Sequence, residues 1–147
     1  MIGPLVSAVR DLVLRPQQDV SDPALRVWYD EDAAPVDAYA QSGDVVPVST
    51  DPVTYTIGGG VVELRHVIAL GLSIDAVDPA TATARRDPIV ADLMARALTV
   101  DWPNVPAGPG QTITRMDAPS IDYTPLGDSE VAAYATLTFT ALTEWVP

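Results

Sequence analysis

The spacing of apolar residues predicts an amphipathic helix at the start of the chain. Over residues 2–14 apolar side chains recur every three or four positions, as one face of a helix requires. They are Ile2, Leu5, Val6, Val9, Leu12 and Val13. Pro4 is compatible with a first helical turn, whereas Pro16 ends the helix because proline has no amide proton to donate.

Two later segments show the period of two that is typical of half-buried strands. In residues 61–74 every second residue is predicted to face a core, and these are Val62, Leu64, His66, Ile68, Leu70, Leu72 and Ile74. In residues 131–145 the same alternation places Ala133, Ala135, Leu137, Phe139, Ala141 and Trp145 on one face. The shorter runs 25–29, 53–57, 112–116 and 120–124 are also β-prone. Residues 30–47 are acidic and contain proline, and we expect them to be mostly loop.

Turn and cap residues separate these segments. The glycines at 58–60 predict a hairpin connection between two strands. Asp78 followed by Pro79 is a helix start signal, and Asp87 followed by Pro88 repeats it. One kinked helix or two short helices would satisfy both signals, and the prolines and glycines of residues 103–110 then predict an irregular connection.

The order helix, strands, helix, strands predicts an α+β fold. We expect a mixed, mainly antiparallel open sheet with two helices packed on one face. A chain of 147 residues that is 48% hydrophobic supports one core, so we expect a single domain over residues 1–147.

Composition limits the classes of function. We expect a soluble, intracellular protein, because no run is long and apolar enough to span a membrane and the N-terminus lacks the basic flank of a secretory signal. The chain has no cysteine, which excludes disulfide and thiolate chemistry. Its net charge is −12, with 20 acidic residues against eight arginines and no lysine, which disfavours binding to nucleic acid. An acidic surface can instead line a passage through which DNA slides without sticking.

No catalytic motif is present in the sequence, and we expect no enzyme activity, cofactor or metal. The single histidine, His66, lies on the apolar face of a predicted strand, where it is either a buried general base or a packed residue with a satisfied ring nitrogen. The latter is favoured because no nucleophile motif accompanies it. One histidine without cysteine also excludes a zinc site built from thiolate and imidazole ligands.

Three further features have a functional and a structural interpretation. The acidic residues Asp30, Glu31, Asp32, Asp37 and Asp44 are a candidate calcium loop, but they lack the spacing of an EF-hand and are better explained as a solvated acidic loop. The glycines at 58–60 lack the lysine and hydroxyl of a phosphate-binding loop. Arg85 and Arg86 either contact a partner or form surface ion pairs.

With these elements placed, the chain resembles the tail terminator proteins of phages with long, non-contractile tails. The resemblance lies in residues 2–14, in GVVELRHVIALGLSID around residues 61–74, in TATARRDPIVADLMARAL over residues 81–98 and in YATLTFTALTEW over residues 134–145. The resemblance concerns the order and size of the elements and the general pattern of their residues, over about half of the chain. The acidic segment 30–52 and the proline-rich connection 103–110 are departures from the family pattern.

The resemblance implies a virion protein made in the host cytoplasm and located at the neck end of the tail. Such proteins form a hexameric ring that caps the tail tube, ends its polymerisation and joins it to the neck or head-tail connector protein. The ring needs a heterologous interface that closes. For contacts with a subunit or partner we expect Val61, Val67, Tyr134, Thr138, Arg85 and Arg86, with the hairpin at Gly59 inserting into a neighbour.

In such a ring we expect the acidic cluster of Asp30, Glu31, Asp32, Asp37 and Asp44 to contribute to the lumen or its rim. DNA would then pass through without specific binding. Three alternatives remain open: a head-completion or neck protein, a tail tube subunit, and a small-ligand binding domain. The last would need a closed apolar pocket lined by Trp28, Tyr29 or Tyr55.

Overall fold

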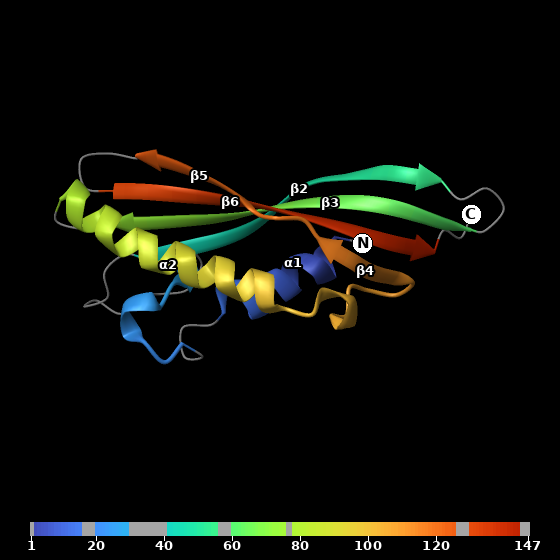
Figure 1. The fold of residues 1–147 in the computed structure, drawn as a ribbon, viewed down its shortest axis with the longest axis horizontal. Helices are drawn as coiled ribbons and strands as arrows, with labels where there is room; N and C mark the ends of the chain where they lie inside the picture. Colours follow the sequence, from blue (N-terminus) through green and yellow to red (C-terminus); the bar gives the residue numbers. More distant parts are fainter. Residues whose placement is uncertain are drawn as a thin grey trace.

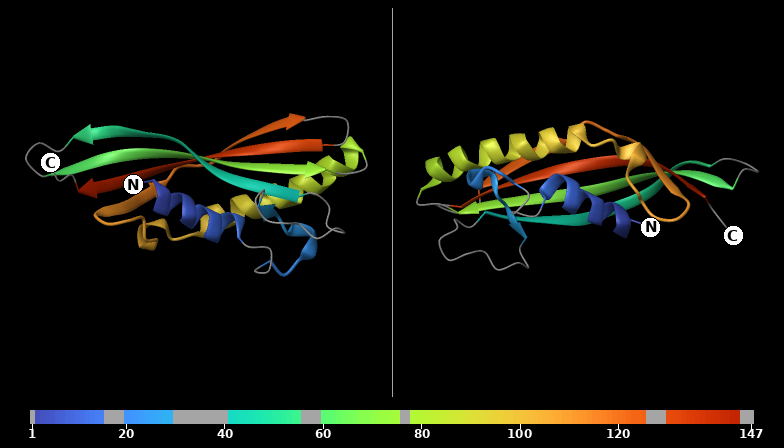
Figure 2. Two further views of the ribbon diagram at one scale, coloured as in Figure 1. Left: turned by 180° about the vertical axis from the view of Figure 1, so that it is seen from behind. Right: turned by 90° about the horizontal axis from the view of Figure 1, so that it is seen from below.

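The computed structural model describes residues 2–15, 20–29, 41–55, 60–75, 78–125 and 130–144. Over these residues a long twisted sheet carries helices on one face (Figure 1 and Figure 2). The predicted α+β class, with a mixed, mainly antiparallel open sheet and two α-helices on one face, is confirmed.

The described elements follow one another in the order helix, strands, helix, strands. They are α1 (Gly3–Val9), the π-helical turn η1 (Arg10–Leu14), the short turn η3 (Pro23–Leu25), β1 (Trp28–Tyr29), β2 (Gln41–Tyr55), β3 (Val61–Asp75), α2 (Pro79–Thr99), the short turn η4 (Trp102–Asn104), β4 (Gln111–Met116), β5 (Ser120–Pro125) and β6 (Glu130–Glu144). The strands predicted at 112–116 and 120–124 correspond to β4 and β5.

Three strands of 15 residues each, β2, β3 and β6, run the length of the sheet. The sheet order is β1-β2-β3-β6-β4, and every described pair is antiparallel except β1 with β2. The edge of β6 that faces away from β3 pairs with β5 over residues 131–136 and with β4 over residues 139–143. Strands β4 and β5 therefore share one edge of β6, one at each end.

The alternation predicted for the two long strands is confirmed over most of their length, but Val62 is half-buried and Trp145 lies outside the described residues. In β3 the even-numbered residues from Leu64 to Ile74 are buried, and the odd-numbered residues with described side chains are half-buried or exposed. In β6 the odd-numbered residues from Ala133 to Ala141 are buried. These two sets face α1 and α2, and we call this side of the sheet the covered face; the opposite side is the open face.

Strand β2 corrects the expectation that residues 30–47 are mostly loop. Residues 41–47 belong to β2 and pair with β3 in regular register, while residues 30–40 lie outside the described part of the chain. Proline is tolerated here because β1 pairs with only two residues of β2, so that Pro47 and Pro52 lie in an edge strand. After each proline the register between β2 and β3 shifts by one residue, so that one residue of β2 is left without a partner in β3.

The connection between β2 and β3 is a hairpin, as the run of glycines predicts. The two strands are consecutive, antiparallel neighbours, and Gly60 at the start of β3 has a φ of 66°, a value that favours glycine. Residues 56–59, including Gly58 and Gly59, lie outside the described residues. The proposed insertion of Gly59 into a neighbouring subunit therefore stays a prediction.

The N-terminal helix begins as predicted but does not stay α-helical. After α1 the chain widens into η1, where the amide of Arg15 donates to the carbonyl of Arg10 at 2.9 Å, five residues earlier. The wider turn buries Val13 and Leu14, whereas Leu12, expected on the buried face, is 37% exposed. Gly43 in β2 permits this packing, because a Cβ there would lie 2.8 Å from Leu14 Cδ1.

The second helix, α2, is one continuous helix with Pro88 inside it. Of the two start signals, only the first begins a helix: Asp78 is the N-cap, and its carboxylate Oδ1 accepts a hydrogen bond from the amide of Thr81 at 2.7 Å. Pro88 lies on the solvent side of α2, where water can hydrate the carbonyl that the proline leaves without a donor.

The Asp78 cap makes a small part of the stability depend on pH. The hydrogen bond from the Thr81 amide lowers the pKa of Asp78. The stabilisation is therefore complete above about pH 4 and is lost as the pH falls through the lower pKa of the folded state. We expect Asp78→Ala to be less stable than wild type at pH 7 and to approach wild type in strong acid, as measured by urea unfolding across pH. Asp78→Asn keeps the cap without the titration, and a pH dependence equal to that of wild type in this variant would contradict the assignment.

The core lies between the covered face and the two helices. Its fully buried side chains come from every layer and include Leu5 and Val9 of α1, Ile89 and Leu93 of α2, and Phe139 of β6. The elements that carry the open face are therefore held from behind by one continuous apolar cluster.

Candidate functional site

His66 is buried on the covered face and takes part in a polar network. Its Nδ1 lies 2.8 Å from Thr50 Oγ1, and its Nε2 lies 2.9 Å from Gln111 Oε1. Gln111 Nε2 donates to the carbonyl of Ala107 at 2.8 Å, which orients the amide so that Oε1 is the acceptor. His66 therefore donates through Nε2 to Gln111 Oε1, and its Nδ1 shares a hydrogen bond with the hydroxyl of Thr50.

This network supports the interpretation of His66 as a packed, satisfied residue. Thr143 also donates to Gln111 Oε1, at 3.1 Å, so the polar side chains satisfy one another across the sheet. A hydroxyl beside an oriented imidazole is also an arrangement used in nucleophilic catalysis, but a substrate additionally needs a hollow beside the hydroxyl. The hollow that the described residues form on the open face is on the opposite side of the sheet, at Gly71.

The open face holds four of the predicted contact residues. Val67 and Thr138 are direct partners in the register of β3 and β6, and both are half-buried. Tyr134 pairs with Gly71, four residues further along β3, and is 43% exposed. Val61 is half-buried at the start of β3, about 20 Å from Val67 at the rise of an extended strand. The register thus gathers three of the four on one part of the face and leaves Val61 at its end.

Two exposed apolar residues of this face were missed from the sequence. Val46 of β2 pairs with Ala69 and is 46% exposed, and Leu142 of β6 pairs with Glu63 and is 41% exposed. Val46 was missed because residues 41–47 were assigned to a loop. Leu142 lies at an even-numbered position of β6, in the same series as Tyr134 and Thr138, and this alternation would have found it.

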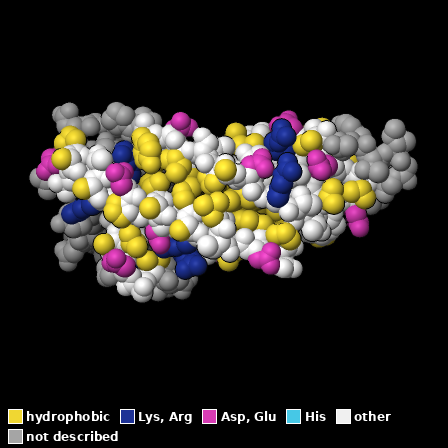
Figure 3. Space-filling model, in the orientation of Figure 1, with side chains coloured by type: hydrophobic (Ala, Val, Ile, Leu, Met, Phe, Trp, Pro, Cys, Tyr) yellow, Lys and Arg dark blue, Asp and Glu magenta, His cyan; other side chains and the backbone are white. Residues whose placement is uncertain are grey.

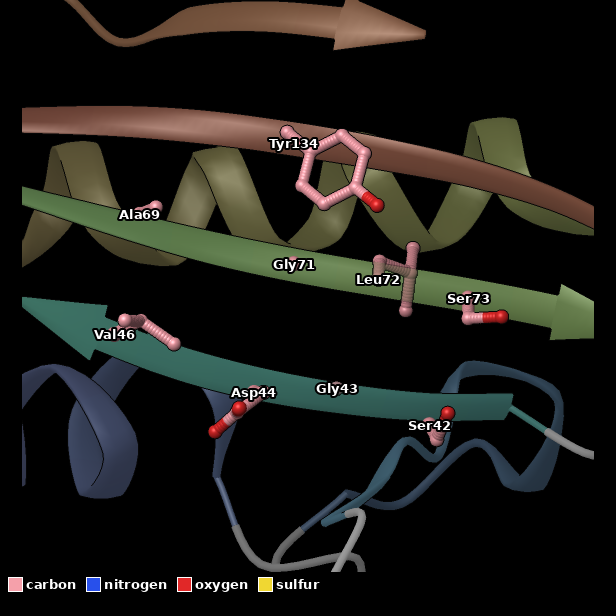
Figure 4. A pocket seen from close by; sticks show the side chains of 9 residues that line it. All are labelled: Ser42, Gly43, Asp44, Val46, Ala69, Gly71, Leu72, Ser73 and Tyr134. Atoms are coloured by element: carbon pink, nitrogen blue, oxygen red, sulfur yellow. The ribbon is translucent and has the colours of Figure 1, made fainter. Parts of the chain in front are cut away.

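A groove of about 250 Å³ lies at one end of the open face, where Gly71 has no side chain (Figure 4). A Cβ at Gly71 would lie 3.5 Å from Cε1 of Tyr134, so the ring packs directly against the glycine. Figure 4 shows this ring broadside between β6 and β3, with Asp44 across the groove on β2. Ser42, Gly43, Val46, Ala69, Leu72 and Ser73 complete the lining.

Asp44 is the one residue of the predicted acidic cluster that the structure describes. It lies in β2, pairs with Gly71 and is half-buried, so its assignment to a loop is wrong. Its Oδ1 accepts a hydrogen bond from the amide of Val45 at 2.8 Å. Asp30, Glu31, Asp32 and Asp37 lie outside the described residues. Their place in a lumen or rim stays a prediction.

Arg85 and Arg86 lie on α2, away from the open face, and both are half-buried. The guanidinium of Arg86 forms an ion pair with Asp87 at 3.1 Å and lies 4.2 Å from the centroid of the Tyr123 ring. These contacts within the chain support the ion-pair interpretation of Arg86, and neither arginine is brought together with Val67 or Tyr134.

The side-chain types are unevenly distributed on the surface. On the side seen in Figure 3, hydrophobic side chains form a band along the middle of the molecule and acidic side chains lie around it. An apolar centre with a charged rim is typical of protein interfaces.

The described residues form neither a metal-binding cluster nor a membrane-spanning helix. Among the described residues, no group of three or more His, Asp or Glu side chains is placed to hold a metal ion. The described helices include none that is long and apolar enough to cross a membrane. Neither a model of a known protein family nor a curated protein matches the chain.

Proposed function

We propose that the protein is a structural component of a phage virion that forms a ring at the neck end of the tail, as a tail terminator does. The observation that carries the proposal is the open face of the sheet, on which Val46, Tyr134 and Leu142 are each more than 40% exposed. Apolar side chains exposed on one face of a long, rigid sheet are typical of a surface that a protein partner covers.

The edge of the sheet formed by β1 and β2 is poorly suited to association by strand pairing. Beyond β1, the outer edge of β2 contains Pro47 and Pro52 and two register shifts. Prolines and bulges prevent a second strand from adding to an edge. Association through a face is therefore favoured over association through this edge, and a face that meets a different surface of the next copy produces a closed ring or a filament.

For the contact between copies we assign the half of the open face that contains Val67, Thr138 and Leu142. These residues lie on neighbouring strands, towards the end of the sheet where β2 and β3 are joined. Arg65 of β3 is exposed on the same face and lies between Val67 and Glu63, the partner of Leu142, so this contact also contains a positive charge. In a ring of six copies, each with a net charge of −12, like charges repel DNA from the walls of the passage, which favours sliding over binding.

Of the alternatives, the small-ligand domain receives least support from the described groove. At about 250 Å³ it is smaller than the roughly 300–1,000 Å³ of usual ligand pockets, and it is open to solvent. A closed pocket would need the side chains of Trp28, Tyr29 and Tyr55, and these side chains lie outside the described part of the structure. A neck protein differs from a tail terminator in what it caps, and the experiment below separates the two.

The test is the assembly of wild type and of two variants that add the same charge. Light scattering after gel filtration and negative-stain microscopy are expected to show rings for wild type, and capped ends when tail tubes are added. Val67→Asp on the open face is expected to weaken assembly at least tenfold, because it places an unpaired charge in an apolar contact. Leu98→Asp, at a 62% exposed position of α2, is the matched control and is expected to assemble normally.

A monomer that neither forms rings nor caps tail tubes would contradict the proposal. Rings that leave tube ends uncapped but bind the head-tail connector would favour the neck protein. Circular dichroism of Val67→Asp confirms that any loss of assembly is not a loss of folding.

A further inference from the structure

Four residues form a row across the open face at the groove. By the register of the sheet, Asp122 of β5 lies opposite Tyr134 of β6, Tyr134 opposite Gly71 of β3, and Gly71 opposite Asp44 of β2. Gly71 makes the hollow, Tyr134 forms one wall, and a carboxylate lies at each end of the row. This arrangement depends on four strands, and its Gly71 lies four residues along β3 from Val67.

The chemistry of the row selects a cation. Asp44 is half-buried, and no arginine of the described residues forms an ion pair with it. Figure 4 shows the Tyr134 ring broadside, so one of its faces is turned outwards beside the hollow, and a ring face attracts a guanidinium or ammonium group. A carboxylate beside the ring adds a charge-assisted hydrogen bond. An anion would be repelled here, and an apolar side chain would leave Asp44 without compensation.

The overall charge indicates which molecule brings that cation. The chain contains 20 acidic residues, eight arginines and no lysine, so a second copy would bring mostly like charge to this acidic row. Of its arginines, Arg115 already pairs with Asp117 at 3.3 Å and Arg96 is buried. A partner with a basic surface is therefore more complementary to this row than a copy of this acidic chain is.

We propose that the groove at Gly71 is a docking site for an arginine or lysine side chain of a basic partner protein. The inference deepens the proposed function and rests on it, because it assigns this part of the open face to a tail or neck partner and leaves the Val67 half to neighbouring copies. The aromatic ring and Ala69 receive the aliphatic stem, and Asp44 receives the charged end.

The experiment uses the peptide rhodamine-Gly-Ala-Leu-Arg-Leu-Ala-Gly-amide, which carries the dye on its N-terminus, and measures its fluorescence anisotropy with the full chain. The same peptide with glutamine in place of arginine is the ligand control. We expect wild type to bind the arginine peptide about tenfold more tightly than the glutamine peptide, with affinity falling as salt increases. Equal binding of the two peptides would overturn the inference.

Two groove variants and one matched control locate the site. Asp44→Asn and Tyr134→Leu are each expected to weaken binding of the arginine peptide about fivefold to tenfold. Asp51→Asn removes a carboxylate that lies on the same strand, opposite Arg65, and is expected to bind as wild type does. If Asp44→Asn binds as tightly as wild type, the groove is not the site.

The two proposals fail separately. Groove variants that lose the peptide but still form rings support the division of the open face. If wild type forms rings but does not bind the arginine peptide, only the proposal of the docking groove is contradicted. Wild type that binds the peptide through Asp44 but never forms rings contradicts only the ring.

Discussion

Phe139→Ala is expected to lower the free energy of unfolding by about 3–5 kcal/mol. Phe139 is the single phenylalanine of the chain and is fully buried in the middle of β6. Its ring meets the ring of Trp102 edge to face, with centroids 4.7 Å apart and an interplanar angle of 71°. Alanine would leave a cavity at the junction of β6, η4 and α2. Urea unfolding monitored by circular dichroism measures the loss.

The size of the effect follows from how firmly the neighbours are held. Trp102 cannot move into the cavity freely, because its Nε1 donates to the carbonyl of Ala97 at 2.9 Å. His66, opposite Phe139 in the register, is held by its own hydrogen bonds. Leu98→Ala removes apolar atoms at a 62% exposed position and is expected to cost less than about 0.5 kcal/mol. A cost below about 1 kcal/mol for Phe139→Ala would contradict the packing described here.

Arg96→Ala is expected to destabilise the protein by about 3 kcal/mol. Arg96 belongs to α2, is buried, and donates through Nη1 to the carbonyls of Val13 at 3.0 Å and Leu14 at 3.1 Å. It also forms an ion pair with Asp92 one turn earlier. The arginine thus satisfies the last carbonyls of η1 and joins the N-terminal helix to α2. Burial lowers the pKa of Arg96 and the Asp92 carboxylate raises it, and the group remains a cation.

The Arg96 prediction has an internal comparison. Arg115→Ala removes an exposed arginine that pairs with Asp117 at 3.3 Å, and is expected to cost less than about 1 kcal/mol. The losses in free energy of unfolding of the two variants, measured by urea unfolding, distinguish a buried arginine that joins two helices from an arginine in a surface ion pair. Equal effects would mean that the contacts of Arg96 with η1 are not formed in solution. Arg96→Lys keeps the charge but not the planar fork, and an intermediate loss is expected.

Together these contacts explain why one side of the sheet can be stable without a layer of the other described elements. Phe139 and Arg96 hold the helices to the covered face from within, so the open face needs no further layer of the same chain to be stable. Mutations in the core are therefore expected to change stability, whereas Val67→Asp and Asp44→Asn are expected to change association.

Where local patterns agree with the packing, the sequence alone was sufficient to predict the element and its buried face. The alternation in β3 is strict because the strand has one buried and one open face, and a shift of its register by one residue would expose the whole apolar set. In β6 the odd-numbered residues follow the same pattern, although Ala132 and Thr140 are buried as well. The start of α2 was predictable because Asp78 and Pro79 act within a single turn. His66 was assigned to the buried face by the same alternation.

Where a structure depends on distant partners, the sequence was insufficient. The proline and glycine of residues 41–47 suggest a loop, but the pairing of 13 residues of β2 with β3 outweighs local preference. The π-helical turn of η1 arises because Leu14 packs at Gly43 and its carbonyl meets Arg96, residues 29 and 82 positions away.

The groove at Gly71 also depends on residues that are far apart in the sequence. Asp44, Gly71, Asp122 and Tyr134 are scattered over the chain, and only the register of β2, β3, β5 and β6 brings them into one row. The sequence by itself determined the elements, the buried faces and the acidic charge, because these depend on periodicity and composition. Tertiary structure decided the edge strand, the widened turn and the groove, because each is a contact between segments whose registers are set by pairing and packing.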